Sequence, residues 1–174
     1  GKPNVILVDA SSWDKKKNQF KKELWENYNV DSMFSGPDFE DPMIWSLAVG
    51  RMLELVEKQL NKKNKDPKIS SHFHEWLAGF ALLYLKKKKV PIGTVFTTHA
   101  TMLGRTIAGS GGDLYDMLSD LNPEEEAKKH NVMDKFTAEK ACAQNCDVFT
   151  TVSEITGIEA EKILGRKPDV LVLN

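Results

Sequence analysis

The chain has 174 residues, of which 41% are hydrophobic and 28% are charged, and its formal net charge is −1. This length suffices for one domain with its own core, or for half of a two-domain enzyme. The nearly balanced charge excludes a bulk electrostatic attraction to nucleic acid or to an anionic membrane. No apolar run approaches the roughly 20 residues of a membrane span, and no signal peptide is recognisable.

Short runs of β-branched and apolar residues alternate along the chain with helical patterns, as is typical of buried strands connected by helices. The expected strands are residues 4–9, 68–73, 91–98, 147–152 and 168–173. The first run follows the start of the chain so directly that we expect the chain to begin within a longer protein. The alternation predicts an α/β fold with a parallel sheet and helices on both faces.

Helices are indicated between these runs by apolar residues spaced three and four apart. One predicted apolar face consists of Ile44, Leu47, Ala48, Met52, Leu55 and Val56, and a later one of Leu77, Phe80, Ala81, Tyr84 and Leu85. The last helix is bounded by Ser153, a favourable N-cap, and by Gly165.

The stretch between residues 104 and 130 is the least regular part of the chain. Its turn from Gly109 to Gly112 lacks the Lys-Ser/Thr of a phosphate-binding loop and favours a flexible surface loop. Asn122 before Pro123 is typical of a helix start. The lysine runs, such as Lys86 to Lys89, fall at predicted helix ends, where cations are favourable, so we interpret them as solvated surface.

Polar residues follow two of the expected strands at the point where an open parallel sheet binds ligands, beyond the carboxyl ends. His74 and Glu75 follow one strand, and His99 and Thr101 follow the next. Both pairs precede or begin a helix, whose first N–H groups favour anionic or hydroxyl-rich ligands. The sequence therefore predicts a polar ligand site at one sheet edge, without identifying the ligand.

Other kinds of site are disfavoured. A zinc pair of His74 and His99 lacks a third ligand with suitable spacing, and Cys142 and Cys146 are typical of a reduced, cytoplasmic pair. His72 lies within a strand, so we expect it to be a structural histidine of the core. The Gly-x-Ser-x-Gly of serine hydrolases and the Gly-x-Gly-x-x-Gly of dinucleotide binding are both absent.

Four blocks of the sequence resemble those of animal and fungal glycogen synthases in content, order and spacing. They are Ser71 to Gly79 (SHFHEWLAG), Phe96 to Arg105 (FTTHATMLGR), Val148 to Ala160 (VFTTVSEITGIEA) and Arg166 to Val170 (RKPDV). Together they cover roughly residues 69–174. The loop at 107–112 departs from the aromatic-rich loop of that family.

The resemblance implies a Rossmann-like domain on the acceptor side of a two-domain glycosyltransferase. Residues 1–174 would be part of its N-terminal domain, with the C-terminal nucleotide-sugar domain absent. The parent would be a cytoplasmic enzyme that transfers glucose from UDP-glucose to the non-reducing end of an α-1,4-glucan with retention, using no metal or other cofactor. Its implied partners are UDP-glucose and the glucan, and a homo-oligomeric parent is compatible with this. The fragment alone is expected to be inactive.

The resemblance also implies roles for individual residues. His74 is the implied catalytic residue, which would bind the glucose 6-hydroxyl and help to stabilise the oxocarbenium-like centre through its backbone carbonyl. The implied substrate-binding residues are Glu75, Trp76, His99, Thr101 and Asn174. Glu75 and Trp76 would also fix the position of His74.

Two other interpretations stay open. The first is a different two-domain glycosyltransferase, or a phosphorylase-like relative. The second is a non-catalytic carbohydrate-binding or regulatory domain that keeps the fold without the chemistry. A catalytic lysine and a cofactor site in the missing half would identify the first. A second Rossmann half with a paired-glutamate motif in the parent protein would distinguish a synthase from the second.

Overall fold

A parallel sheet of four strands forms the centre of the fold. The computed structural model describes residues 2–63 and 67–172. The strands lie side by side in the order β1 (Ser70–His74), β2 (Gly93–Thr98), β3 (Val148–Thr151) and β4 (Val170–Leu171). All neighbouring pairs are parallel. The α/β class and the last four predicted strands are confirmed, although β4 is shorter than expected and residue 173 lies outside the described residues.

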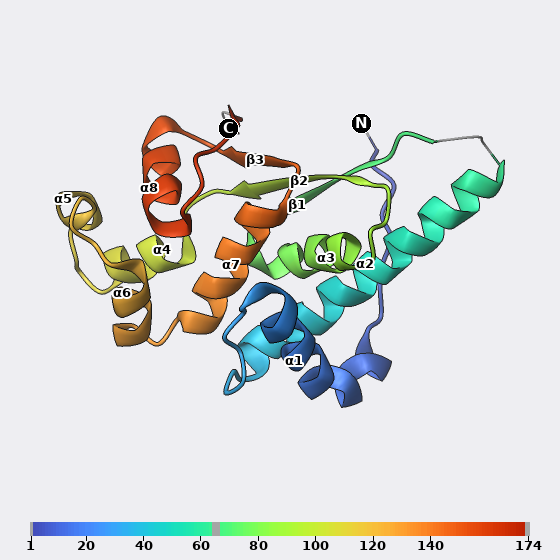
Figure 1. Cartoon of the computed structure of the whole chain (residues 1–174), viewed down its shortest axis with the longest axis horizontal. Helices are drawn as coiled ribbons and strands as arrows, with labels where there is room; N and C mark the ends of the chain where they lie inside the picture. Colours follow the sequence, from blue (N-terminus) through green and yellow to red (C-terminus); the bar gives the residue numbers. More distant parts are fainter. Residues whose placement is uncertain (1, 64–66, 173–174) are drawn as a thin grey trace.

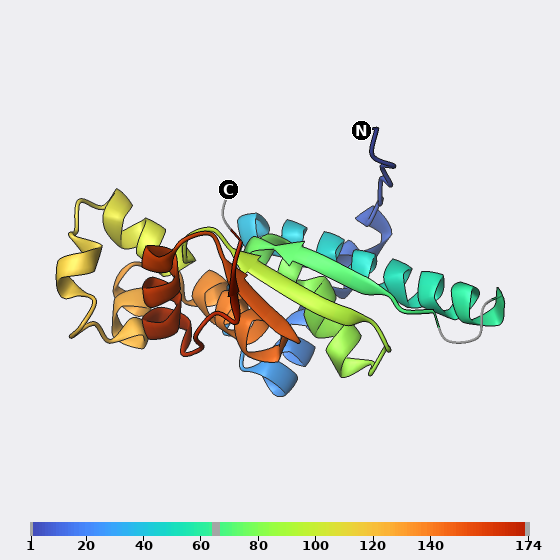
Figure 2. The ribbon, with the colours of Figure 1, turned by 90° about the horizontal axis from the view of Figure 1, so that it is seen from above.

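Helices fill the connections and the region before the sheet. Their bounds are η1 (Ser11–Lys16), α1 (Lys17–Tyr28), α2 (Pro37–Lys63), α3 (Glu75–Lys87), α4 (Met102–Gly109), α5 (Leu114–Met117), α6 (Pro123–Lys129), α7 (Met133–Asn145) and α8 (Glu154–Leu164). In Figure 1, α2, α3 and α7 all lie on the same side of the sheet. Figure 2, which looks down on the sheet, shows these helices behind it. A second helical layer, which we expected, is not found within residues 2–63 and 67–172.

The one-sided arrangement follows from the order of the strands. Each strand pairs with the next one along the chain, and connections between parallel strands are right-handed in roughly 98% of cases. Successive right-handed crossovers in one direction place every connecting helix on the same face. A helix on the other face requires the strand order to reverse, and no such reversal occurs among the four described strands.

The predicted strand at residues 4–9 is wrong. These residues pair with no strand of the described chain, and Leu7 is 91% exposed. Figure 2 shows the segment leaving the body of the domain before η1. A run of valine, isoleucine and leucine satisfies the sequence pattern of a strand, but a strand also needs a neighbour for its backbone hydrogen bonds.

The covered face of the sheet is apolar. Phe73, Phe96 and Phe149 stand in register across β1, β2 and β3, and all three are buried. The rings of Phe96 and Phe149 stack with their centroids 6.0 Å apart. Burial of each such side chain contributes about 1.5–3 kcal/mol, so this row holds the sheet against α3 and α7.

α3 is the central helix and packs on several sides. It contacts β1 and β2 as well as α2 and α7, so most of its circumference is apolar and buried. The predicted apolar face was therefore too narrow, because Leu82 and Leu83 are also buried. It was also misplaced at Leu77, which is 44% exposed.

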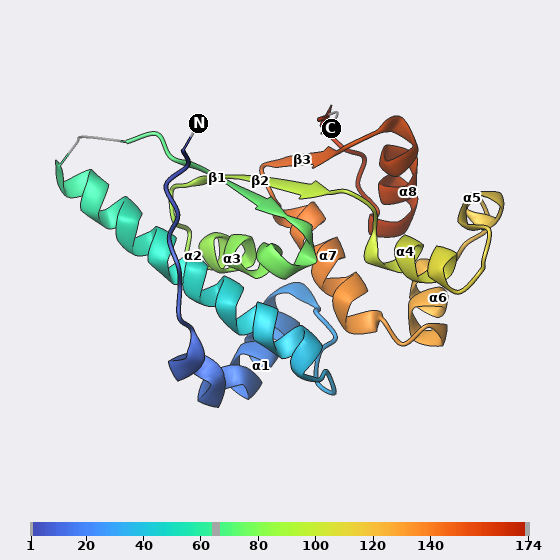
Figure 3. The same cartoon turned by 180° about the vertical axis from the view of Figure 1, so that it is seen from behind.

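The predicted apolar face of α2 is correct in its first half only. Ile44, Leu47 and Ala48 are buried, whereas Leu55 and Val56 are exposed. Figure 3 shows that the C-terminal part of α2 extends beyond the other helices. The outer side chains there project from the body of the domain.

α3 and α7 cross where one of them has no side chain. A Cβ at Gly79 would overlap Sγ of Cys142 and approach its Cβ to 3.2 Å. The Cys142 thiol is free and buried, and burial raises its pKa well above the ordinary value. This close approach gives a packing reason for the glycine that ends the first sequence block.

Capping residues set the helix boundaries as expected. Ser153 accepts a hydrogen bond from the Thr156 amide at the start of α8, and Gly165 ends that helix with φ 73°. Asn122 caps α6 in the same way. The stretch at 104–130, expected to be irregular, contains α4, α5 and α6, so the expected loop is confined to a short turn after α4.

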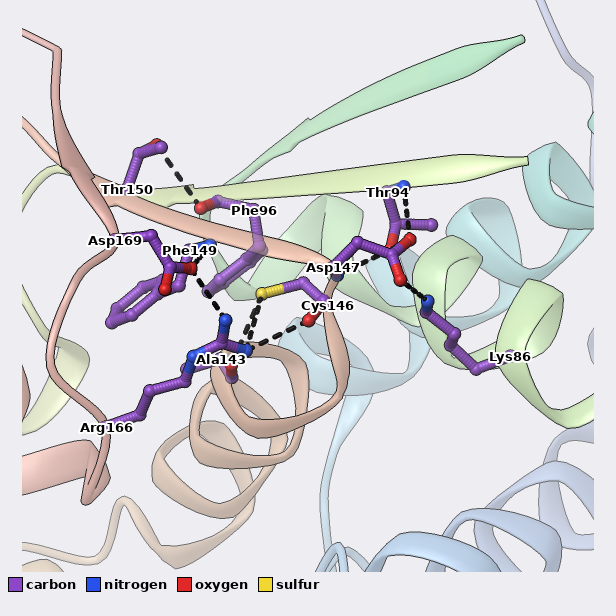
Figure 4. A network of polar contacts seen from close by, with 10 residues as sticks. All are labelled: Lys86, Thr94, Phe96, Ala143, Cys146, Asp147, Phe149, Thr150, Arg166 and Asp169. Carbon is purple, nitrogen blue, oxygen red and sulfur yellow. Dashed lines mark hydrogen bonds and ion pairs between the residues drawn. The ribbon is translucent and has the colours of Figure 1, made fainter. Parts of the chain in front are cut away.

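The block that begins at Arg166 has a structural role at the start of β3 (Figure 4). Nη1 of Arg166 donates to the carbonyl oxygens of Ala143 (2.8 Å) and Cys146 (2.9 Å), at the end of α7. Nη2 donates to Oδ2 of Asp169 at 2.7 Å. That oxygen also accepts the Phe149 amide, which lowers the pKa of Asp169. One guanidinium thus ties α7, β3 and the segment after α8 together.

We expect Arg166→Ala to lower the free energy of unfolding by about 2 kcal/mol, because hydrogen bonds to a charged group contribute about 1.5–3 kcal/mol. Asp169→Asn is the matched control. It keeps an oxygen for the Phe149 amide and removes only a half-exposed charge, so its cost should stay below about 1 kcal/mol. Urea unfolding of the two variants measures both values. Equal losses would show that the ion pair, and not the carbonyl contacts, carries the stabilisation.

Candidate functional site

The turn between β1 and α3 contains no spare residue. His74 ends β1 in an extended conformation, and Glu75 begins α3 directly after it. Glu75 makes this turn with φ 63°, a left-handed conformation that costs a residue other than glycine about 1–2 kcal/mol. Strain of this kind persists only where surrounding contacts hold it, and it collects at functional sites.

Three imidazoles gather beside this turn. Nδ1 of His74 lies 3.1 Å from Nε2 of His99, so β1 and β2 bring these two predicted residues together. The ring centroid of His72 lies 4.2 Å from that of His74, and its Nε2 lies 2.6 Å from Oγ1 of Thr97. Desolvation, followed by the two neighbouring histidines, lowers the pKa of His72. The His72 ring therefore favours its neutral form.

His72 is not the core histidine that we expected. Its side chain is exposed, because successive residues of a strand point to opposite faces. Phe73 occupies the covered face, so His72 and His74 both project from the face that the helices leave open.

The carboxylate of Glu75 links the site residues to each other. Its Oε1 accepts the backbone amide of His99 at 2.9 Å and Nη2 of Arg105 at 3.0 Å. Arg105 also donates from Nε to the carbonyl oxygen of Ala100 at 3.2 Å. A guanidinium is thereby held beside the loop that carries the His99 imidazole.

Two further carboxyl groups hold the loop between β2 and α4, which we call the His99 loop (residues 98–102). Oε1 of Glu159 accepts both the amide (2.7 Å) and the hydroxyl (2.6 Å) of Thr101. The carboxyl group of Glu139 lies 2.6 Å from Oγ1 of Thr98 and accepts the amide of Met102 at 2.7 Å. α3, α7 and α8 each contribute one carboxyl group to this loop.

Two predicted substrate-binding residues are placed where they cannot touch a ligand. Trp76 is 5% exposed and stacks on Phe39 in the core, with ring centroids 5.6 Å apart. Thr101 is fully buried and caps α4 through the Gly104 amide. Both can position their neighbours, but neither offers surface to a substrate. Asn174 lies outside the described residues.

A hollow of about 540 Å³ adjoins the His99 loop. Its polar lining includes the side chains of Arg105, Asp113, Tyr115 and Glu159. The hydroxyl of Tyr115 lies 3.5 Å from Oε2 of Glu159. None of the three histidines lines this hollow, whereas Arg105 both lines it and contacts Glu75.

Sequence reasoning missed three residues that organise the site, namely Arg105, Glu139 and Glu159. Arg105 and Glu159 stand inside recognised blocks but were given no role. Glu139 had a detectable signal, because it lies three residues after Phe136 and three before Cys142, on the apolar side of a helix. A lone carboxyl group at such a position is buried, and a buried carboxyl group needs hydrogen-bonding partners.

The described residues include no group of three or more histidine, cysteine or acidic side chains that could hold a metal ion. Within the same residues, no helix is both long and apolar enough to cross a membrane.

The fold and the site together define an α/β protein in which polar side chains collect at the carboxyl edge of a parallel sheet, the position where such sheets bind ligands. The glycogen synthase family model matches residues 1–174, and the chain belongs to that family.

The chain is 40% identical to glycogen [starch] synthase of Caenorhabditis elegans over 174 residues, which is all of this chain and 26% of the relative. It is 40% identical to the Dictyostelium discoideum enzyme, covering 19% of it. It is 37% identical to glycogen [starch] synthase isoform 1 of Saccharomyces cerevisiae, and it covers 24% of that relative. The chain thus spans about a quarter or less of the length of these relatives.

Substitution of Glu75 should separate stability from function. Glu75→Gly relieves a left-handed backbone but removes the acceptor for His99 and Arg105. The relief of about 1–2 kcal/mol offsets most of the cost of losing the two hydrogen bonds to the Glu75 carboxylate, since bonds to a charged group contribute about 1.5–3 kcal/mol. The net change in stability should therefore be small. The activity of the full-length protein should fall at least about tenfold, since small misplacements at a site are costly.

Lys89→Gly is the control for this prediction. Lys89 has φ 52° and lies beyond the C-terminal end of α3, away from the site. Its replacement should relieve the same kind of strain and leave the activity of the full-length protein unchanged. Unfolding curves of both variants measure their stability, and an activity assay on both measures their function. A Glu75→Gly protein with full activity would contradict the positioning role.

Proposed function

We propose that the full-length protein is a glycogen synthase that transfers glucose from UDP-glucose to the non-reducing end of an α-1,4-glucan with retention, and that this chain supplies the acceptor-side half of its cleft. One observation carries the proposal. Two family blocks that are distant in sequence deliver His74, His99 and Arg105 to the same sheet edge. Family membership over the whole chain supports it.

The arrangement suggests how His74 acts on a sugar. The contact between Nδ1 of His74 and Nε2 of His99 requires one ring to donate and the other to accept. If His99 donates, Nδ1 of His74 is the acceptor, and the proton of neutral His74 lies on Nε2. That N–H is then free to donate to a sugar hydroxyl, for which we propose the glucose 6-hydroxyl.

Positive charge develops at C1 of the glucose as UDP departs, and fixed dipoles that face this charge lower the barrier. The carbonyl oxygen of His74 belongs to the strained turn that Glu75 holds, so we propose it as such a dipole. Arg105 remains paired with Glu75, and this pairing keeps the loop in place while the substrate binds. No metal or other cofactor is needed in this scheme.

The chain alone is not proposed to be active. The relatives are about four or more times longer, and we place the cationic groups for the UDP diphosphate in the part outside this chain. The proposed location is the cytoplasm, in keeping with the free thiols of Cys142 and Cys146. A homo-oligomeric full-length protein is compatible with this proposal.

Incorporation of labelled glucose from UDP-glucose into glycogen tests the proposal on the full-length protein. His74→Ala should lower turnover by about a hundredfold or more, the size of effect seen when one charge-stabilising donor is lost. The 174-residue chain alone should show no incorporation. Incorporation from UDP-glucose should exceed that from other nucleotide-glucose donors.

His130→Ala serves as the control, because His130 lies at the end of α6 and contacts Glu126, not the site. It should keep turnover near that of the wild type. Full-length protein that binds glycogen but transfers no glucose from any donor would support a non-catalytic carbohydrate-binding domain instead. Strong incorporation by the isolated chain would overturn the assignment of half a cleft.

A further inference from the structure

Glu139 is a carboxyl group inside the protein that the proposed function does not use. It lies on α7 and is 0% exposed. Its two oxygens face the His99 loop, where Oε1 lies 2.6 Å from Oγ1 of Thr98 and Oε2 accepts the Met102 amide at 2.7 Å. These two contacts bracket the loop at its first and last residues.

A count of hydrogens indicates the state of this carboxyl group. The Thr98 hydroxyl has one hydrogen and two acceptors within reach, Oε1 of Glu139 at 2.6 Å and the carbonyl oxygen of Ala100 at 3.2 Å. If Glu139 were ionised, both acceptors would compete for that hydrogen. If Glu139 is protonated, it donates to Thr98, Thr98 donates to Ala100, and Met102 donates to Glu139. Each donor and each acceptor in this series of hydrogen bonds then has a partner.

The charges around Glu139 favour the same state. Glu75 of α3 and Glu159 of α8 face it, and Cys142 lies one turn away on α7 itself. The cation of α4, Arg105, is bound to Glu75 and to the Ala100 carbonyl. Neither of the hydrogen bonds of Glu139 within the described chain comes from a cation. Burial above all, with contributions from Glu75 and Glu159, raises the pKa of Glu139 to about 8, although its hydrogen bonds with Thr98 and Met102 act in the opposite direction.

We propose that Glu139 is a positioning residue that holds the His99 loop as a neutral acid and so keeps His99 in contact with His74. The effect on turnover rests on the proposed function, whereas the protonated state and the loop contacts do not. Loss of the proton would place a third negative charge beside Glu75 and Glu159, and it would withdraw the Thr98 hydrogen from Ala100. The loop that carries His99 would then lose the geometry described above.

Glu139→Gln provides the discriminating variant. A glutamine amide has the shape of a neutral glutamic acid, so its nitrogen can donate to Thr98 and its oxygen can accept from Met102. At neutral pH we expect turnover within about twofold of the wild type, and we expect the variant to keep its activity above pH 8, where the wild type loses it. Glu139→Leu keeps the bulk but no hydrogen bond, and its kcat should fall by about tenfold to a hundredfold.

Two measurements on the full-length protein do not depend on activity. An infrared difference spectrum of wild type minus Glu139→Gln at pH 7 should contain the carbonyl band of a protonated carboxyl group. Thermal unfolding should also differ. A folded protein that keeps a proton which the unfolded chain releases loses stability as pH rises, here between pH 4.5 and about 8. Glu139→Gln should remove that decline.

Glu54→Gln is the matched control. Glu54 is another buried glutamate, but it accepts hydrogen bonds from Lys58, Tyr84 and Arg51, which lower its pKa to about 2. Its stabilisation is present above pH 4.5 and is lost as pH falls toward 2. This variant should therefore leave the decline between pH 4.5 and 8 intact.

The outcomes separate cleanly. Absence of the carboxyl band, together with an unchanged pH decline in Glu139→Gln, would overturn the proposal even if the enzyme is a glycogen synthase. A Glu139→Gln protein as impaired as Glu139→Leu would also overturn it. If the full-length protein transfers no glucose, the proposed function fails, and the spectrum and the unfolding curves still decide the state of Glu139. If Glu139→Leu does not fold, the comparison of wild type with Glu139→Gln is sufficient.

Discussion

The direction of the strand crossovers determines most of this structure. Because each strand pairs with its successor, right-handed connections keep all helices on one side. As a second consequence, α3, α4 and α8 all begin just beyond the carboxyl ends of β1, β2 and β3. Three helix starts and three strand ends therefore meet along one edge. The polar residues collect there because the backbone of each connection is already fixed by the sheet.

The two ends of the sheet are stabilised by different means. At the start of β3, Arg166 joins carbonyl oxygens at the end of α7 to Asp169 (Figure 4). At the carboxyl edge, three carboxyl groups from three helices hold a five-residue loop. Ionised carboxyl groups brought together in this way repel one another, and the repulsion is smaller when one of them is neutral. The contacts at one end of the sheet thus support the fold, whereas the other end brings three carboxyl groups close together beside the candidate site.

The sequence predicted the parts of the fold that depend on local rules. Strands with buried phenylalanines and helices with good caps, such as Ser153 and Asn122, were found where they were expected. Prediction failed where an outcome depends on distant partners. The run at residues 4–9 lacks a neighbouring strand, and Leu77 lies on a helix whose surroundings on several sides were unknown. Periodicity shows that a residue can be buried but does not show what would cover it.

The candidate site was predictable to a similar extent. The positions of the strand ends identified His74 and His99 as neighbours, and Nδ1 of His74 lies 3.1 Å from Nε2 of His99. The same rule could not tell a residue facing the candidate site from one supporting it. Trp76 and Thr101, which the family resemblance implied as substrate-binding residues, are both buried. The supporting glutamates come from helices that are distant in sequence. Their contribution becomes visible only when the helices are placed around the loop.

The close crossing of α3 and α7 limits which substitutions the sequence tolerates at positions 79 and 142. Positions 79 and 142 share a single volume, which the sulfur atom of Cys142 already fills. Position 142 can therefore shrink to alanine or serine without a clash, but position 79 cannot gain a methyl group while the sulfur atom stays where it is. A separation of the two helices would displace α3, whose first residue, Glu75, accepts hydrogen bonds from the His99 amide and from Arg105. The glycine at position 79 thus keeps α3 at the spacing on which these contacts beside the candidate site depend.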